Sequence, residues 1–303
     1  MSFFKTLSSF TNKNIGSKLR NPYFNNIYNG KVQTIILDNS GTCVDPFVIA
    51  PAIVFKEVFH KFHIDITMNE ARVPMGIRKD LHIAQILEMP RVQEEFKKVY
   101  NRQSTQEDIL NIYNAFIPMQ LEVLPEYCNL LPKVTSTMDL LRKNDIQFGT
   151  TTGFNREMVD CIIKNTKDKG LDFNTTTACD DFSDDEKKLG SRPKPFMLWK
   201  NLFKLDTYPI QSVVKVDDTI TGIHEGLNAG CWTVGISAYS NYMNVDSLEQ
   251  WKNMSIKEKN EKKNNSRSKL QNESNAHYVI DEFEELIPVI EDINIRIKQG
   301  EKP

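Results

Sequence analysis

The feature that most constrains this chain is a short apolar strand that runs directly into an aspartate. Residues 34–37 are Thr-Ile-Ile-Leu, and residues 38–42, which follow at once, are Asp-Asn-Ser-Gly-Thr. Open α/β sheets bind ligands at the carboxyl ends of their strands, so this order predicts that Asp38 lies at a ligand site. A carboxylate there can bind Mg²⁺ and can attack phosphorus, although an aspartate that caps the following turn gives the same pattern.

Apolar strands alternate with helical segments along much of the chain. This alternation predicts an α/β fold with a doubly wound parallel sheet. We expect strands at residues 32–38, 147–151, 175–178, 212–216 and 232–236, and helices at residues 134–142, 156–169 and 220–229. Residues 278–293 return as a strand and a final amphipathic helix. The 303 residues are enough to bury a full core and to carry an insertion.

The first predicted strand is followed by a long segment with only helical patterning. Apolar residues at three- and four-residue steps predict a helix at residues 51–63, and helical patterns continue at 77–88 and 92–123. We therefore expect a helical cap over residues 48–130, inserted into a core of residues 31–47 and 131–303. A helical lid suits a reaction that must exclude water.

Two segments differ in composition from the rest of the chain. Residues 1–30 carry four basic residues and no acid, which is typical of an N-terminal extension and also of a transit peptide. Residues 252–276 hold six lysines and six asparagines among 25 positions, so we expect a mobile low-complexity insertion there. A basic interaction patch is the alternative for this second segment.

Composition also bears on the partners and the surroundings of the protein. The formal net charge of −2 gives no reason to expect nucleic acid as a partner. No apolar run approaches the roughly 20 residues that cross a membrane, so no membrane partner is expected. The five cysteines are scattered and lack CxxC spacing, which favours reduced thiols in a cytoplasmic setting over disulfides or a zinc site. We interpret Cys43, beside the Asp38 turn, as a small filler residue.

Three later motifs follow Asp38 in a fixed order. Residues 148–153 run from a strand into a hydroxyl-bearing turn, residues 191–195 form a basic turn around Arg192, and residues 212–219 form a strand that ends in two acids. As an ordered set over residues 32–236, these motifs resemble those of the haloacid dehalogenase superfamily of phosphotransferases. The resemblance implies a Rossmann-like hydrolase core with an inserted cap.

The segment between the first two motifs narrows the resemblance to one family. Residues 71–82, residues 88–91 and the run Thr-Thr-Gly-Phe-Asn-Arg-Glu-Met at 151–158 resemble phosphonoacetaldehyde hydrolase (phosphonatase). That family is metal-dependent and forms an imine between a cap lysine and its aldehyde substrate. The resemblance implies that Lys79 is this lysine, that Met75 and His82 bind substrate near it, and that the protein forms a homodimer.

The resemblance also implies a nucleophile and a metal site. Asp38 would attack phosphorus, and Mg²⁺ would be bound by Asp38, the backbone carbonyl of Ser40 and Asp218. The substrate would be phosphonoacetaldehyde or a similar small phosphonate.

The remaining residues of the predicted site would hold the phosphoryl group. Thr152 and the backbone amide of Gly153 would donate hydrogen bonds to it. Arg192 would supply fixed positive charge to the phosphoryl oxygens and to Asp38.

Two departures from the family pattern leave other functions open. Ser40 stands where related phosphatases carry an aspartate that protonates the leaving group, and Asp217 and Gly222 stand where the family has a glycine and an acid. Adjacent strand residues point to opposite faces, so we expect the Asp217 side chain to point away from the metal site. We therefore expect Mg²⁺ to bind weakly. The fold should tolerate Gly222→Asp, and this substitution should tighten Mg²⁺ binding. The alternatives are a phosphatase for another small phosphorylated metabolite, with Lys79 only binding it, and a catalytically weak or inactive relative with a binding role.

Overall fold

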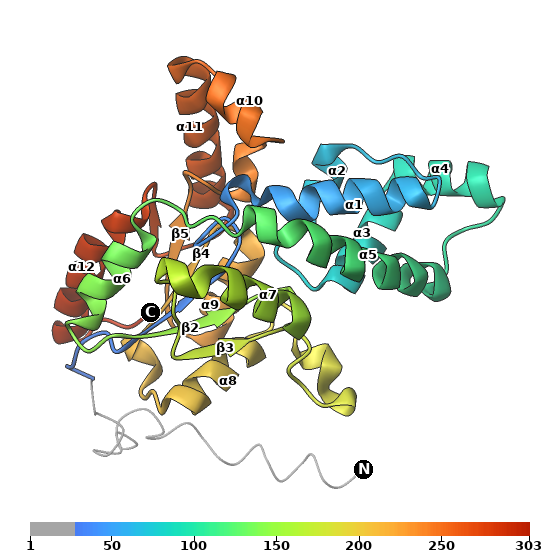
Figure 1. Cartoon of the computed structure of the whole chain (residues 1–303). Coiled ribbons are helices and arrows are strands. Elements are labelled where there is room, and N and C mark those ends of the chain that lie inside the picture. Colours follow the sequence, from blue (N-terminus) through green and yellow to red (C-terminus); the bar gives the residue numbers. More distant parts are fainter. Residues whose placement is uncertain (1–27) are drawn as a thin grey trace, which may run out of the picture.

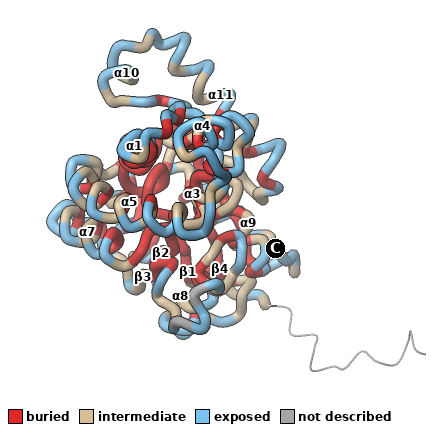
Figure 2. The backbone as a smooth tube through the Cα atoms, turned by 90° about the vertical axis from the view of Figure 1, so that its right-hand side faces the viewer, coloured by how far each residue is buried: buried red, intermediate tan, exposed pale blue. Residues whose placement is uncertain are grey.

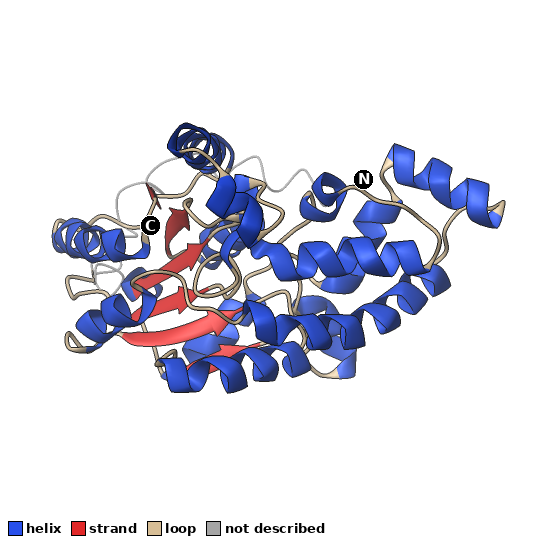
Figure 3. Cartoon of the chain, turned by 45° about the horizontal axis from the view of Figure 1, so that its top comes forward, coloured by secondary structure: helices blue, strands red, loops and turns tan. Residues whose placement is uncertain are grey.

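The computed structural model describes residues 28–303, and the N-terminal extension expected over residues 1–30 lies outside the described residues up to position 27. Six strands form one sheet in the order β3-β2-β1-β4-β5-β6, and every neighbouring pair is parallel (Figure 3). The strands are β1 (Thr34–Leu37), β2 (Gln147–Thr151), β3 (Thr175–Thr177), β4 (Val213–Asp217), β5 (Trp232–Ile236) and β6 (Tyr278–Ile280). The expected doubly wound parallel sheet is confirmed.

Helices cover both faces of this sheet, because successive side chains of the central strand point to opposite sides. Ile36 packs into a cluster with Leu198 and Leu202, whereas Ile35 and Leu37 belong to the larger core on the other face. The helices outside the cap are α6 (Val134–Arg142), α7 (Arg156–Thr166), α8 (Phe196–Leu205), α9 (Ile220–Ala229), α10 (Leu248–Asn253), α11 (Ile256–Glu273) and α12 (Leu286–Lys298).

Of the α-helices between β1 and β2, all except α6 lie together at one side of the sheet (Figure 1). They are α1 (Ile49–Lys61), α2 (Met68–Arg72), α3 (Lys79–Leu87), α4 (Pro90–Tyr100) and α5 (Gln106–Tyr127). The buried rings of Phe55 in α1 and Phe116 in α5 stack with their centroids 4.5 Å apart. These apolar contacts continue the larger core that contains Ile35 and Leu37 into the helices, at the end of the sheet where the strands terminate.

The structure differs from the prediction of a mobile segment at residues 252–276, which lie mostly in α10 and α11. Ser255 caps α11 in a reciprocal pair of hydrogen bonds with Glu258. Ser266 and Leu270, one helical turn apart, are buried, and Lys263 and Arg267 make ion pairs with Glu282 and Asp281 at 3.0 and 2.9 Å. Most other residues of this segment are exposed (Figure 2) and polar. The few buried positions therefore do not show in the overall composition.

The packing of α11 can be measured through Leu270. We expect Leu270→Ala to lower the free energy of unfolding by about 2–3 kcal/mol, because it removes a fully buried side chain beside Gly235 of β5. Ile256→Ala, at a side chain that is 78% exposed, is the matched control and should change stability by less than about 0.5 kcal/mol. Denaturant unfolding followed by circular dichroism checks both, and equal stabilities would contradict a packed α11.

The described residues contain five cysteines, and none of them forms a disulfide. Four are buried, Cys43 among them, and burial raises the pKa of the Cys43 thiol well above its ordinary value. Cys43 is therefore packed as a small core residue, as expected. In the part of the chain from residue 28 onward, no helix combines the length and the apolar character that a membrane span requires.

Candidate active site

A cavity lies where the cap meets the carboxyl ends of β1, β2 and β4. Most of the residues predicted from the sequence line it, although they come from distant parts of the chain. They are Asp38, Ser40, Met75, Lys79, Thr152, Gly153, Arg192 and Asp218. Gly76, Phe154 and Thr219 also line the cavity and were not predicted.

The turn after β1 sets the position of Asp38. The amide of Asp38 donates to the carbonyl of Val216 at 3.0 Å, which continues the pairing of β1 with β4 past the last strand residue. Gly41 has a positive φ of 79°, and a Cβ there would lie 2.5 Å from Oδ2 of Asp218. Glycine is therefore required at position 41 both by the backbone conformation and by the closeness of Asp218.

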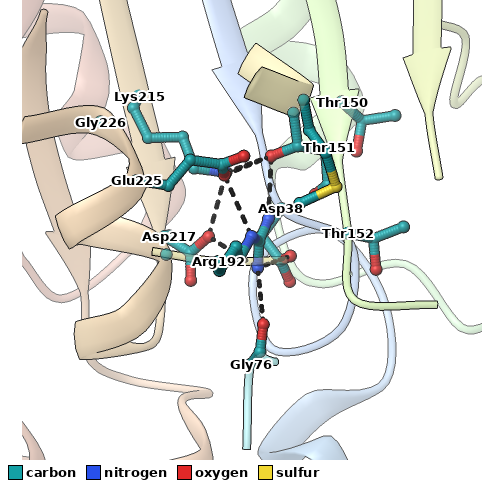
Figure 4. Close-up of polar contacts among 12 residues, drawn as sticks. Asp38, Gly76, Thr150, Thr151, Thr152, Arg192, Lys215, Asp217, Glu225 and Gly226 are labelled. Carbon is teal, nitrogen blue, oxygen red and sulfur yellow. Dashed lines mark hydrogen bonds and ion pairs between the residues drawn. The ribbon is translucent and has the colours of Figure 1, made fainter. Parts of the chain in front are cut away.

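Arg192 is buried and held from several sides. Its Nη1 lies 2.9 Å from Oδ1 of Asp38, its Nε lies 3.0 Å from Oε2 of Glu225, and its Nη2 donates to the carbonyl of Thr151 at 2.6 Å (Figure 4). Such a guanidinium cannot lose its proton or turn away, so it is a fixed positive charge beside Asp38.

A second buried cation, Lys215, lies behind Arg192. Its Nζ is 3.0 Å from Oδ2 of Asp217, 3.4 Å from Oε2 of Glu225 and 2.8 Å from the hydroxyl of Thr151 (Figure 4). Lys215, Glu225 and Thr151 were not predicted as site residues from the sequence. One signal was available, because Lys215 is a charged residue inside the apolar run of β4.

Three carboxylates converge at the edge of the sheet. Oxygens of Asp38, Asp217 and Asp218 all lie within 4.8 Å of one another. Asp218 accepts from the amide of Asn241 at 2.8 Å through Oδ2, while its buried Oδ1 has no hydrogen-bond partner. The expectation that Asp217 points away is wrong. Asp217 ends β4 and Asp218 already lies in the bend that follows, so the alternation of side chains along a strand does not apply.

The pKa values of these acids reflect their crowding. Burial, aided by the charge of Asp217, raises the pKa of Asp38 to about 6. Burial together with Asp217 and Asp38 raises the pKa of Asp218 well above its usual range. Burial would also raise the pKa of Asp217, but Lys215 and Arg192 outweigh it and lower that pKa. The unpartnered oxygen of Asp218 and the closeness of the three carboxylates fit a hard divalent cation such as Mg²⁺.

Lys79, the first residue of α3, is buried under aromatic rings. Its Nζ lies 4.8 Å from the ring centroid of Phe154, 5.6 Å from that of Phe55 and 4.0 Å from Sδ of Met75. Among the side chains that the structure describes, no carboxylate forms an ion pair with Lys79, which is 5% exposed. Burial lowers the pKa of Lys79 to about 8, so a substantial part of it is uncharged at mildly alkaline pH.

His82 does not lie where a substrate-binding residue was expected. Its ring is fully buried, stacks on Phe55 with centroids 3.9 Å apart, and lies 2.9 Å from the carbonyl of Ala71 through Nε2. Burial lowers its pKa well below the ordinary value. His82 thus supports the Phe55 ring near Lys79 and does not line the cavity.

Comparison with known proteins gives close relatives, although no family model matches the chain. Phosphonoacetaldehyde hydrolase of Paraburkholderia xenovorans (strain LB400) is 35% identical over 272 residues, which cover 90% of this chain and 99% of the relative. The protein of the same name from Bacillus cereus (strain G9842) is 36% identical over 87% of this chain and 97% of the relative.

Solved structures show the same similarity. The crystal structure of a phosphonoacetaldehyde hydrolase-like protein from Oleispira antarctica is 34% identical, has a TM-score of 0.85, and matches over 91% of this chain and 98% of that one. The β-phosphoglucomutase of Clostridium difficile, 17% identical with a TM-score of 0.61 over 88% and 98% of the two chains, shares the fold.

Proposed function

The chain belongs to the phosphonoacetaldehyde hydrolase family, and we propose on this premise that it cleaves the carbon–phosphorus bond of phosphonoacetaldehyde or a similar small phosphonate. The observation that carries this proposal is that Lys79 and Asp38 line the same cavity, one as a buried amine and the other as a carboxylate beside a fixed guanidinium. An amine that can form an imine and a carboxylate that can accept a phosphoryl group are the two parts that this cleavage needs.

Lys79 makes the carbon a leaving group. Its uncharged amine adds to the aldehyde carbon and water departs, which gives a protonated imine. When the carbon–phosphorus bond breaks, its electron pair moves into the imine and the carbon leaves as an enamine. Protonation of the enamine and hydrolysis of the resulting imine release acetaldehyde and the free lysine.

Asp38 accepts the phosphoryl group. One carboxylate oxygen bonds to phosphorus as the carbon departs, and water then hydrolyses the aspartyl-phosphate to inorganic phosphate. Arg192 holds Asp38 and the phosphoryl oxygens, while the Thr152 hydroxyl and the Gly153 amide donate hydrogen bonds to those oxygens. Because the leaving group is an enamine, no acid is needed at position 40, and Ser40 suits a phosphonate better than an ester.

Asp38, the Ser40 carbonyl and Asp218 are the residues that would hold Mg²⁺. The cation, when bound, offsets the repulsion between the carboxylate and the anionic phosphoryl group. We also propose that residues 48–130 act as a lid over the core of residues 31–47 and 131–303, with Met75 and Phe154 excluding water from the imine. A homodimer stays a prediction, to be checked by light scattering.

The buried position of Lys79 leads to a pH dependence. Below pH about 8 the amine is protonated and cannot attack, so the rate of imine formation should rise about tenfold per unit between pH 6 and 7.5 and level off above 8. An exposed lysine would level off near its ordinary value of 10.5. The initial rate of borohydride-trapped adduct, measured by mass spectrometry, reports this directly.

The variant Asp38→Asn tests whether the charge of Asp38 influences the pKa of Lys79. The negative charge of Asp38 raises the pKa of Lys79, so Asp38→Asn should move the midpoint of this profile to lower pH. A profile that still rises above pH 10, or a midpoint that moves up in the variant, would contradict the burial of a reactive Lys79.

Phosphate release from phosphonoacetaldehyde, compared with release from p-nitrophenyl phosphate, tests the function. We expect release from the phosphonate and little from the ester. Release from the ester alone would favour a phosphatase, and release from neither would favour the non-catalytic alternative.

A further inference from the structure

Arg72, the last residue of α2, joins the cap to the core. It is only 2% exposed. Its Nη2 donates to the carbonyl of Val245 at 2.6 Å, its Nη1 donates to Oδ1 of Asn241 at 3.2 Å, and its Nε lies 3.4 Å from Oδ1 of Asp246. These three partners lie in the core, on the loop between β5 and α10. Nη1 also donates to the carbonyl of Phe47, just before α1, at 2.6 Å. One buried guanidinium of the cap thus binds groups on two core segments.

Asn241 contacts both Arg72 and the active site. Its Nδ2 donates to the backbone carbonyl of Arg72 at 3.1 Å, so two hydrogen bonds in opposite directions join these residues. Its backbone amide donates to Oδ2 of Asp218 at 2.8 Å. Hydrogen bonds that involve a charged group are stronger than neutral ones, and these residues are buried. The loop after β5 therefore links the cap to the edge of the sheet where Asp38 and Asp218 lie.

Short contacts lead from Arg72 to Lys79 inside the cap. The amide of Met75 donates to the carbonyl of Arg72 at 3.1 Å, and Sδ of Met75 lies 4.0 Å from Nζ of Lys79. Nε2 of His82 lies 2.9 Å from the carbonyl of Ala71, which ties α3 to the end of α2. Lys79 is the first residue of α3, so its position follows that of Arg72.

The turn between Arg72 and Lys79 touches the core at a second place. Gly76 has a positive φ of 97°, and a Cβ there would lie 2.6 Å from the hydroxyl oxygen of Thr219. The carbonyl of Gly76 also accepts a hydrogen bond from Nη1 of Arg192, at 3.4 Å (Figure 4). Because this bond is long and the rest of the contact is van der Waals packing, the attachment at Gly76 is weak. The hydrogen bonds of Arg72 supply the stronger attachment.

The core surface under Gly76 is rigid. The Thr219 hydroxyl donates to Oδ1 of Asp217 at 2.7 Å and accepts from the amide of Gly222 at 3.2 Å. A Cβ on Gly222 would collide with the carboxylate of Asp217, which Lys215 holds at 3.0 Å. The expected tolerance of Gly222→Asp is therefore wrong. Because these groups are fixed, how closely the turn approaches them depends on the attachment at Arg72.

We propose that Arg72 is a positioning residue for the imine chemistry, because it holds the turn between α2 and α3 on the core and thereby keeps Lys79 in the cavity with Asp38. Arginine suits this role, since its planar fork can bind several groups at once and lysine offers a single ammonium. Cleavage needs the amine and the nucleophile on one substrate at the same time, so the closed cap must be populated. The inference rests on the proposed function, because it assigns to Arg72 the placement of a lysine that this function uses.

The test is the steady-state kinetics of Arg72→Met on the full chain, measured below its unfolding temperature. The variant keeps an unbranched side chain and loses every hydrogen bond to the core. We expect KM for phosphonoacetaldehyde to rise by about 10- to 100-fold, because less of the free protein is closed, while kcat at saturation changes by less than about threefold. A smaller folded fraction would instead lower kcat at unchanged KM. Arg72→Lys, with one ammonium, should reverse only part of the rise in KM.

Arg91→Met is the matched control, because Arg91 binds Glu70 at 2.7 Å and both residues lie in the cap. It should leave KM unchanged. Asn241→Ala removes the side chain opposite Arg72, keeps its own backbone amide, and should raise KM by about three- to tenfold. Combined with Arg72→Met it should add nothing further, since two changes within one contact are not additive. Multiplied effects in the double variant, a loss of kcat at unchanged KM, or wild-type kinetics in Arg72→Met would overturn the inference.

Hydrogen–deuterium exchange of the free protein separates this inference from the proposed function. Arg72→Met should speed exchange of the amides at residues 73–79 by at least about tenfold, and Arg91→Met should not. Unchanged exchange in Arg72→Met would overturn the attachment by Arg72. Faster exchange in a protein that does not cleave phosphonoacetaldehyde would support the attachment and overturn the reaction alone.

Discussion

Asp38→Asn should reduce phosphate release from phosphonoacetaldehyde by at least about 10³-fold, because an amide cannot form the aspartyl-phosphate. The change is nearly isosteric and removes one of three crowded carboxylates, so the fold should persist. Arg192 keeps its contacts with Glu225 and Thr151 when Asp38 is neutral. Steady-state phosphate release and thermal unfolding of the variant measure the two effects.

The control for this substitution is Asp145→Asn, at a carboxylate that is 91% exposed. It should release phosphate at the wild-type rate. In addition, beryllofluoride, which mimics a phosphoryl group, should bind the wild type only with Mg²⁺ and should not bind Asp38→Asn. Unchanged turnover in Asp38→Asn would remove Asp38 from the mechanism.

Lys79→Arg should also reduce phosphate release from phosphonoacetaldehyde by at least about 10³-fold, because arginine keeps the charge but does not form an imine. Since Lys79 is buried between Phe55 and Phe154, the longer side chain also strains the packing. Lys79→Met therefore serves as a second variant, which fills the apolar pocket without an amine. Both variants are assayed for phosphate release from phosphonoacetaldehyde and from p-nitrophenyl phosphate.

Lys56→Arg, at an exposed position on α1, is the matched control and should retain full activity. Any weak ester hydrolysis by the wild type should survive in Lys79→Met, because that reaction needs Asp38 and Arg192 but no imine. Retention of phosphonate cleavage in Lys79→Arg would instead assign Lys79 a binding role.

The strands β1, β4 and β5 could be predicted closely from the sequence because each is a short, largely apolar run bounded by turn residues. The cavity could be anticipated for a related reason, since residues that follow parallel strands meet at one edge of the sheet. Lys79 was located by resemblance of its segment, and the structure adds the aromatic rings that bury it.

The contacts that could not be predicted join side chains from segments that are far apart in the sequence. Arg192, Lys215 and Glu225 come from a loop, a strand and a helix, and no spacing relates them before the chain folds. Asp217 and Asp218 converge because Asp217 ends β4 and Asp218 lies in the bend that follows, where side chains no longer alternate between the two faces. His82 illustrates a further limit, because a position in a motif does not determine which way its ring faces.

The same limit applies to α11. Its packing depends on the two buried side chains Ser266 and Leu270 among many polar ones, so a rule based on composition predicted a mobile segment. Spacing at four residues was the signal that composition obscured.

The central claim about this protein is that Lys79 forms an imine with an aldehyde substrate in a cavity shared with Asp38. The direct measurement is borohydride reduction of the wild type during turnover of phosphonoacetaldehyde, followed by peptide mapping with mass spectrometry. We expect one stable adduct, on the peptide that contains Lys79, and no adduct in Lys79→Met. Phosphate release without any adduct, or an adduct on a different lysine, would contradict this claim.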